Sequence, residues 1–259
     1  MTLIIPLPHE QHGASPLVML HGLFGSATNF RSVAKRLSAK RPVYCLDLRN
    51  HGNADWEDDH TYPAMAADVI NWMDTQCLDR VDLLGHSMGG KVAMATALTE
   101  PSRIRRLVSV DIAPVKYRSS LGEYVEVMHG IDLGSMKSRA DVDKAMAEAI
   151  PEQGIRAFLL QNLKRGDQGM QWRINLEALQ ANMAAIAAYP DFGARSFDNP
   201  TLMLHGGRSD YVLERHKVAI YALFPRARIK TIDDAGHWVH AERPEQFVTE
   251  VEDFLDAEQ

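Results

Sequence analysis

Residues 81–98, VDLLGHSMGGKVAMATAL, form the segment that most constrains how this chain can fold. The apolar run at 81–84 suits a short buried strand, a glycine-rich turn follows it, and a run of good helix formers begins near Lys91. A strand that passes directly into a helix is the repeating unit of α/β proteins, in which the helix packs back onto a parallel sheet. The segment therefore predicts a parallel sheet covered by helices.

Strand-like and helical runs alternate along most of the chain. The helical runs show apolar residues at helical spacing, and the strand-like runs are short, apolar and bounded by turn residues. The expected strands are 17–20, 43–48, 81–84, 104–110, 201–204 and 229–232, and the expected helices are 30–39, 62–73, the run from Lys91, part of 211–224, and 244–255. This order predicts an α/β fold with a mostly parallel sheet.

The alternation stops between about residues 114 and 195, where no strand-like run of the same quality occurs. Ser138-Arg139-Ala140-Asp141 predicts a capping box for a helix that runs to about Ile150, and residues 155–163 and 176–188 also have helical character. We therefore expect a division into an α/β core of residues 1–113 and 196–259 and an inserted helical cap of residues 114–195.

Composition narrows the class of protein. The 259 residues are 46% hydrophobic, the net charge is −6, and the isoelectric point is near 6.0, which predicts neither a nucleic-acid surface nor a basic membrane anchor. Residues 1–13 lack the basic and apolar regions of a signal peptide, and no apolar run has transmembrane length. Cys45 and Cys77 lie outside any C-x-x-C pattern or metal-like cluster, so both are expected to be reduced and half-buried. We expect a cytoplasmic monomer or homodimer that binds neither nucleic acid nor membrane.

The glycine-rich turn matches two chemical motifs. A serine nucleophile on a strained turn requires G-x-S-x-G, which Gly85, Ser87 and Gly89 provide. A phosphate-binding loop requires G-x-x-x-x-G-K-[ST], and the match holds until Val92 replaces the hydroxyl residue that binds Mg²⁺. The phosphate alternative also leaves the HG turn after the first strand and the terminal GH pair unexplained. We expect a nucleophile, with a nucleotide site as the alternative.

A serine nucleophile needs partners that lie elsewhere in the chain. A base must take the proton of Ser87, and a carboxylate must orient that base. His237 follows the last predicted strand and is the candidate base. In this class of site the acid lies between them in the sequence, and Asp111 and Asp210 both lie there after predicted strands. Ligands of parallel sheets bind beyond the carboxyl ends of the strands, so these residues are expected to meet at one edge.

The developing negative charge on the substrate needs backbone N–H donors. The N–H of Met88, directly after the nucleophile, is expected to be one of them. The second is expected from the loop that follows the first predicted strand, with Leu23 as the preferred residue and Phe24 as the second choice.

With these residues identified, the sequence resembles the α/β-hydrolase superfamily and, within it, the YbfF-type bacterial serine esterases. The resemblance is carried by HGLFGSATNF, DLRNHG, GHSMGGK, VDIAPV and AGHWVHAERP. It implies a carboxylesterase-type serine hydrolase that acts on a small-molecule ester, or on a thioester such as acyl-CoA, through an acyl-enzyme. It also implies a helical cap over the pocket, and it implies no cofactor; we expect no metal.

The resemblance leaves two candidates for the acid. Most of the superfamily places it after the strand at 201–204 in a G-x-x-D pattern, which residues 207–210 match. The YbfF-like branch tends to have a serine near this position and to use the aspartate of the DIAP motif, which is Asp111 here. The sequence carries both aspartates, and we favour Asp210 by its position, with Asp111 as the alternative.

Neighbouring polar residues are interpreted as structural. His86 is expected to pack beside the nucleophile, His21 to brace the oxyanion loop, and Asp47, Arg49 and His51 to tie down a loop near the pocket. Two other functions remain as alternatives. One is carbon–carbon bond hydrolysis, which would need a cation such as Arg49 or an arginine of the cap. The other is a hydrolase-fold receptor that binds a ligand.

Overall fold

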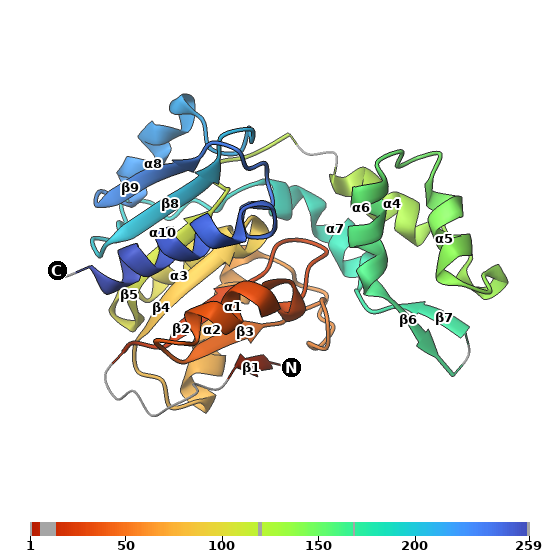
Figure 1. Cartoon of the computed structure of the whole chain (residues 1–259), viewed down its shortest axis with the longest axis horizontal. Helices are drawn as coiled ribbons and strands as arrows, with labels where there is room; N and C mark the ends of the chain where they lie inside the picture. The colour runs from red at the N-terminus through yellow and green to blue at the C-terminus, as the bar shows by residue number, and fades with distance from the viewer. Residues whose placement is uncertain (1, 6–13, 119–120, 168, 258–259) are drawn as a thin grey trace.

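A seven-stranded sheet organises the computed structural model, which describes residues 2–5, 14–118, 121–167 and 169–257. The strand order is β1-β3-β2-β4-β5-β8-β9; β1 runs antiparallel to β3, and all other neighbouring strands are parallel (Figure 1). The strands are β1 (Thr2–Ile5), β2 (Leu17–Leu20), β3 (Val43–Leu46), β4 (Val81–His86), β5 (Ile104–Val110), β8 (Thr201–Gly206) and β9 (Ala227–Ile232). The expected mostly parallel sheet is confirmed, and β1 is an additional edge strand that the sequence pattern did not predict.

Helices cover both faces of the sheet, which explains why its strands are apolar runs and not alternating patterns. In β2, Leu17 and Met19 pack into one buried cluster, and Val18 and Leu20 into the other. The first cluster includes α1 (Arg31–Leu37) and α10 (Pro244–Asp256), and the second includes α2 (Tyr62–Thr75), α3 (Met88–Thr99) and α8 (Lys217–Leu223). Pro244 is the first residue of α10, as its fixed φ favours.

The chain between β5 and β8 leaves the sheet and forms a separate group of elements (Figure 1). Its helices are α4 (Leu121–His129), α5 (Arg139–Met146), α6 (Gln153–Leu159) and α7 (Leu176–Ala187). The predicted capping box begins α5: Ser138 accepts from the Asp141 N–H, and Asp141 accepts from the Ser138 N–H. The helix ends at Met146, four residues before the expected end.

The expectation of a purely helical insertion is wrong at one place. β6 (Leu163–Gly166) and β7 (Gly169–Trp172) pair as an antiparallel hairpin. These strands lie outside the main sheet and are only partly buried, so Lys164, Arg165 and Gln171 occupy positions that are apolar in buried strands. The apolar signal that reveals a core strand is therefore missing here.

The cysteines also differ from their expectation. Cys45 is fully buried in β3, and Cys77 is exposed two residues after the end of α2, so neither is half-buried. Within the described residues, every helix is too short or too polar to cross a membrane.

Candidate active site

Ser87 occupies the sharp turn between β4 and α3. Its φ is 53°, a value that L-residues rarely adopt and that stores strain. The glycines on either side make the turn possible: a Cβ at Gly85 would lie 2.0 Å from the Gly89 carbonyl oxygen, and a Cβ at Gly89 would lie 2.3 Å from the Leu20 carbonyl oxygen. The turn is therefore built to lift one serine above the carboxyl edge of the sheet.

His237 and Asp111 meet at this edge. His237 lies in the loop after β9, and its Nδ1 is 2.6 Å from Oδ2 of Asp111. Asp111 follows β5 directly and is fully buried. The Gly206 N–H donates to its Oδ1 over 3.1 Å, and the Ser209 hydroxyl donates to its Oδ2. The carboxylate thus has a fixed orientation toward the imidazole.

The preference for Asp210 is corrected by this geometry. Asp210 is exposed to solvent, whereas Asp111 holds the His237 ring nitrogen. β5 and β8 are neighbours in the sheet, so both aspartates follow adjacent strand ends, and their position in the sequence does not separate them. The residue from the G-x-x-D pattern that reaches the site is Ser209, which donates to Asp111; sequence reasoning missed it, although the resemblance had pointed to a serine near this position.

Two aromatic side chains hold His237 from other directions. His86 Nε2 lies 2.8 Å from the His237 carbonyl oxygen, so this nitrogen carries the proton and donates. Burial lowers the pKa of His86 well below its usual value, which keeps the ring neutral. The Tyr211 ring stacks on the His237 ring at a centroid distance of 4.3 Å. His86 is thus a structural neighbour, as expected, and Tyr211 is a second residue that sequence reasoning missed.

The expected oxyanion donors differ in what their N–H groups contact. Phe24 N–H donates to Nε2 of His51 over 3.2 Å, so the second choice of the sequence analysis already has an acceptor and is corrected. Among the described residues, the N–H groups of Leu23 and Met88 have no such acceptor. Met88 is the first residue of α3, where N–H groups lack an intrahelical partner. A small cavity of about 30 Å³ touches Leu23, Ser87 and Met88 together.

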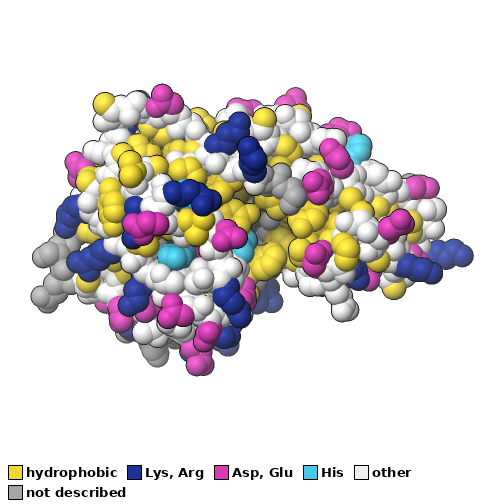
Figure 2. All heavy atoms as spheres, turned by 90° about the horizontal axis from the view of Figure 1, so that it is seen from above, with side chains coloured by type: hydrophobic (Ala, Val, Ile, Leu, Met, Phe, Trp, Pro, Cys, Tyr) yellow, Lys and Arg dark blue, Asp and Glu magenta, His cyan; other side chains and the backbone are white. Residues whose placement is uncertain are grey.

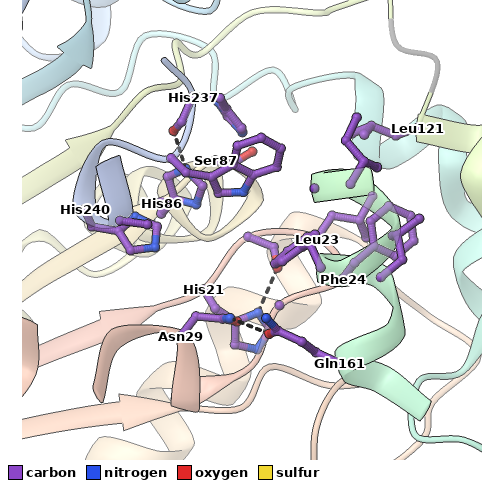
Figure 3. A pocket seen from close by; sticks show the side chains of 18 of the residues that line it. His21, Leu23, Phe24, Asn29, His86, Ser87, Leu121, Gln161, His237 and His240 are labelled. Atoms are coloured by element: carbon purple, nitrogen blue, oxygen red, sulfur yellow. Dashed lines mark hydrogen bonds between the residues drawn. The ribbon is translucent and has the colours of Figure 1, made fainter. Parts of the chain in front are cut away.

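A larger cavity of about 940 Å³ opens beside Ser87 and His237 (Figure 3). One wall comes from the loops at the carboxyl edge of the sheet, and the other comes from α4, α6 and the residues after them. The second wall consists of Leu121, Tyr124, Gly154, Ile155, Phe158, Leu159 and Gln161. Figure 2 shows hydrophobic side chains gathered where the segment between β5 and β8 meets the rest of the molecule. The cavity is therefore mostly apolar on the side of α4 and α6, and Ser87 and His237 line it on the side of the sheet.

Lys91 does not serve a phosphate loop. Its side chain is 2% exposed, and Nζ donates to the carbonyl oxygens of Ala187 and Ala188 at the end of α7, over 3.1 and 2.6 Å. Carbonyl groups at a helix C-terminus lack intrahelical donors, and the Lys91 amine donates to them although burial lowers its pKa to about 7. Lys91 therefore joins the helix that follows Ser87 to the segment between β5 and β8, and the nucleotide alternative loses its phosphate ligand.

The Arg49 side chain is also bound by other residues of the protein. Its guanidinium donates to both carboxylate oxygens of Asp68, over 2.6 and 2.7 Å, and to the Asp59 carbonyl oxygen. The Asp68 carboxylate raises the pKa of Arg49 above its usual value. The structural role expected for Arg49 is confirmed by these contacts.

The sequence of the chain matches known proteins over nearly its whole length. The model of the alpha/beta hydrolase family matches residues 17–250. The chain belongs to this family. Esterase YbfF of Escherichia coli K12 is 35% identical to this hydrolase over 247 residues, which cover 95% of each chain. The sn-1-specific diacylglycerol lipase ABHD11 of Mus musculus is 40% identical over 247 residues, which cover 92% of this chain and 80% of that protein.

A solved structure also agrees with the assignment of the chain to the alpha/beta hydrolase family. A marine microorganism esterase superposes on this hydrolase with a TM-score of 0.93 at 32% identity, covering 98% of both chains. These matches confirm the α/β-hydrolase fold, the resemblance to YbfF and the expectation of a carboxylesterase-type hydrolase.

Proposed function

We propose that the chain hydrolyses carboxylic esters through an acyl-enzyme, with Ser87 as nucleophile, His237 as base and Asp111 as the acid that orients His237. One observation carries the proposal: Ser87 stands on a strained turn and lines the same cavity as His237, whose far nitrogen contacts a buried carboxylate. This arrangement contains each part that a serine hydroxyl needs to become nucleophilic.

In this mechanism Ser87 Oγ attacks the ester carbonyl carbon while Nε2 of His237 takes the hydroxyl proton. The N–H groups of Leu23 and Met88 receive the oxyanion of the tetrahedral intermediate. His237 then returns the proton to the leaving alcohol, and the acyl group stays on Ser87. Water repeats the sequence and releases the acid. Within the described residues the Ser87 hydroxyl has no hydrogen-bond partner, and catalytic hydrogen bonds often form only when substrate is bound.

The cavity supports a hydrophobic substrate. A volume of about 940 Å³ with walls that include Leu121, Ile155 and Phe158 suits an apolar acyl or alcohol group of medium to long chain. One relative is named a diacylglycerol lipase, which fits the same choice. We propose that residues 114–195 act as a cap that forms one wall of this cavity, and that acyl-CoA thioesters are accepted as well as oxygen esters.

The test compares wild type with Ser87→Ala on p-nitrophenyl esters from acetate to palmitate. We expect hydrolysis by wild type, a loss of kcat by several orders of magnitude in the variant, and a preference for chains longer than acetate. The release of free CoA thiol from palmitoyl-CoA tests whether the enzyme also hydrolyses thioesters. Equal activity of Ser87→Ala and wild type would contradict the proposal.

Carbon–carbon bond hydrolysis on the same residues is less well supported. Such a substrate carries a carboxylate that needs a free cation near the nucleophile, and Arg49 is paired with Asp68. Among the described residues that line the cavity, Arg118 is the arginine that could supply this cation. Turnover of a dienoate ring-fission product without turnover of simple esters would favour this reaction.

A further inference from the structure

The loop that carries Leu23 contains a strained residue that other parts of the molecule hold in place. The Gly25 N–H donates to the Gly22 carbonyl oxygen over 2.9 Å, which closes a four-residue turn with Leu23 and Phe24 at its centre. Phe24 has a φ of 62°, whereas Leu23 has an ordinary negative φ. This combination defines a type II turn, in which the third residue is usually glycine because other residues are strained there.

A type II turn has an alternative in which the central peptide is rotated by about half a turn. That rotation gives a type I turn, relieves the positive φ of the third residue, and reverses the directions of the central N–H and C=O groups. In this loop the central peptide consists of the Leu23 carbonyl and the Phe24 N–H, directly after the proposed oxyanion donor. The observed form must therefore be stabilised by contacts outside the turn, because Phe24 alone disfavours it.

The first such contact comes from the core. Nε2 of His51 accepts the Phe24 N–H over 3.2 Å, and Nδ1 of the same ring lies 3.0 Å from the Arg49 carbonyl oxygen. A carbonyl only accepts, so Nδ1 carries the proton and Nε2 presents its lone pair. Burial lowers the pKa of His51 well below its usual value, so the ring stays a neutral acceptor.

The second contact comes from the segment between β5 and β8. Nδ2 of Asn162 donates to the Phe24 carbonyl oxygen over 2.8 Å and to the Leu159 carbonyl oxygen over 3.1 Å. Asn162 is 1% exposed and ends the short 3-10 helix η4 (Leu160–Asn162). Nearby, Nδ2 of Asn29 donates to Oε1 of Gln161 over 3.0 Å (Figure 3). Both backbone groups of Phe24 are thus held, from opposite parts of the molecule.

We propose that His51 and Asn162 are positioning residues for the oxyanion hole. His51 holds the Leu23–Phe24 peptide through the Phe24 N–H, and Asn162 holds the next peptide through the Phe24 carbonyl oxygen, so that together they keep the turn in the form required for a working oxyanion hole. Asn162 makes this form depend on the segment between β5 and β8, so the oxyanion hole is complete only when that segment is seated on the core. This inference rests on the proposed serine hydrolase function.

The experiment uses Asn162→Leu and His51→Leu, each of which removes that residue's hydrogen bond with Phe24 while keeping a side chain of similar volume. Two readouts are taken for each protein: kcat and KM for the best p-nitrophenyl ester, and the inhibition constant of a trifluoromethyl ketone of the same chain length. The ketone forms a tetrahedral adduct with Ser87 and reports on oxyanion binding. We expect kcat to fall about 10- to 100-fold, KM to change less than about threefold, and ketone affinity to fall in step with kcat.

Matched variants separate this role from folding. Asn182→Leu removes a comparable contact between the same two parts of the molecule, with the Asp58 carbonyl oxygen, and does not touch Phe24. His60→Leu removes a buried histidine beside His51. Both should retain wild-type ketone affinity. His51→Gln keeps an acceptor at the same reach and should recover most of the lost kcat. If a leucine variant does not fold, Asn162→Ala and His51→Ala replace the leucine variants in the same two readouts.

The outcomes distinguish the two proposals. If Ser87→Ala abolishes hydrolysis but the Asn162 and His51 variants keep wild-type kcat and ketone affinity, the positioning role is wrong and the hydrolase function stands. A rise in KM with unchanged kcat and ketone affinity also overturns it, because the residues then shape only the substrate pocket. If wild type shows no Ser87-dependent hydrolysis, both proposals fail.

Discussion

At the scale of single residues, the carboxylate of Asp111 receives hydrogen bonds from Gly206, Ser209 and His237, whereas Asp210 faces solvent. Buried carboxylates persist when donors satisfy them, and this one has its donors in place before substrate arrives. Its geometry is that of a group that sets the tautomer of an imidazole.

The prediction at this scale compares Asp111→Asn with Asp210→Asn. An asparagine at 111 presents an amide that favours the wrong tautomer of His237, so kcat should fall by roughly 10³- to 10⁴-fold with little change in KM. Asp210→Asn should change kcat by less than about threefold, because the Asp210 side chain is exposed and the carboxylate that contacts His237 is that of Asp111. Initial rates on one p-nitrophenyl ester, with thermal melts as the folding control, decide between them. A large loss in Asp210→Asn would restore the assignment that the sequence favoured.

At the scale of elements, the close packing of β4 and α3 against β2 leaves no room for a side chain at Gly85 or Gly89. The close approach of Gly89 to the Leu20 carbonyl oxygen lets the first turn of α3 sit directly against the end of β2. Gly154 in α6 is the opposite case, since a Cβ there would meet nothing within 4 Å. The same substitution should therefore have opposite effects at the two positions.

We expect Gly89→Ala to lower the free energy of unfolding by about 3 kcal/mol or more, because a methyl group would overlap backbone atoms that cannot move aside. Gly154→Ala should leave stability unchanged or raise it by about 0.5–1 kcal/mol through better helix propensity. Urea unfolding followed by circular dichroism measures both. Equal midpoints for the two variants would contradict the packing described for the turn.

At the scale of the whole molecule, burial places several histidines where they remain neutral. Desolvation lowers the pKa of each below its usual value, to about 4 for His60 and His240. The group consists of His21, His51, His60, His86 and His240. Below pH 6.5 the unfolded chain binds protons at these positions that the folded chain does not bind.

The sign of the pH dependence follows from this difference. The free energy of unfolding that these neutral histidines add above pH 6.5 should be lost as the pH falls below 6.5, down to about pH 4 for His60 and His240. The slope should be about 1.4 kcal/mol per pH unit for each additional proton that the unfolded chain binds. Urea midpoints between pH 7 and pH 5 measure the slope, and His60→Gln should reduce it by about one proton. A flat profile over this interval would show that the histidines titrate alike in both states.

The sequence by itself determined the features that depend on neighbours along the chain. Residues 81–98 predicted strand, turn and helix; the alternation predicted the parallel sheet; and Ser138 and Asp141 predicted the start of α5, all as observed. Each of these follows from spacing within one or two elements, where the side-chain period and cap chemistry are local.

Only the tertiary structure decided the features that join distant residues. β1 is a four-residue run beside two prolines and the β6–β7 hairpin lacks an apolar pattern, so strand pairing reveals both of them. Asp111 and Asp210 follow neighbouring strands, and only the three-dimensional path of the loops beyond β5 and β8 brings one of them to His237. Phe24, His51 and Asn162 come together from three separate segments. Side-chain partners of this kind are set by how strands and loops pack in space, which spacing along the sequence does not encode.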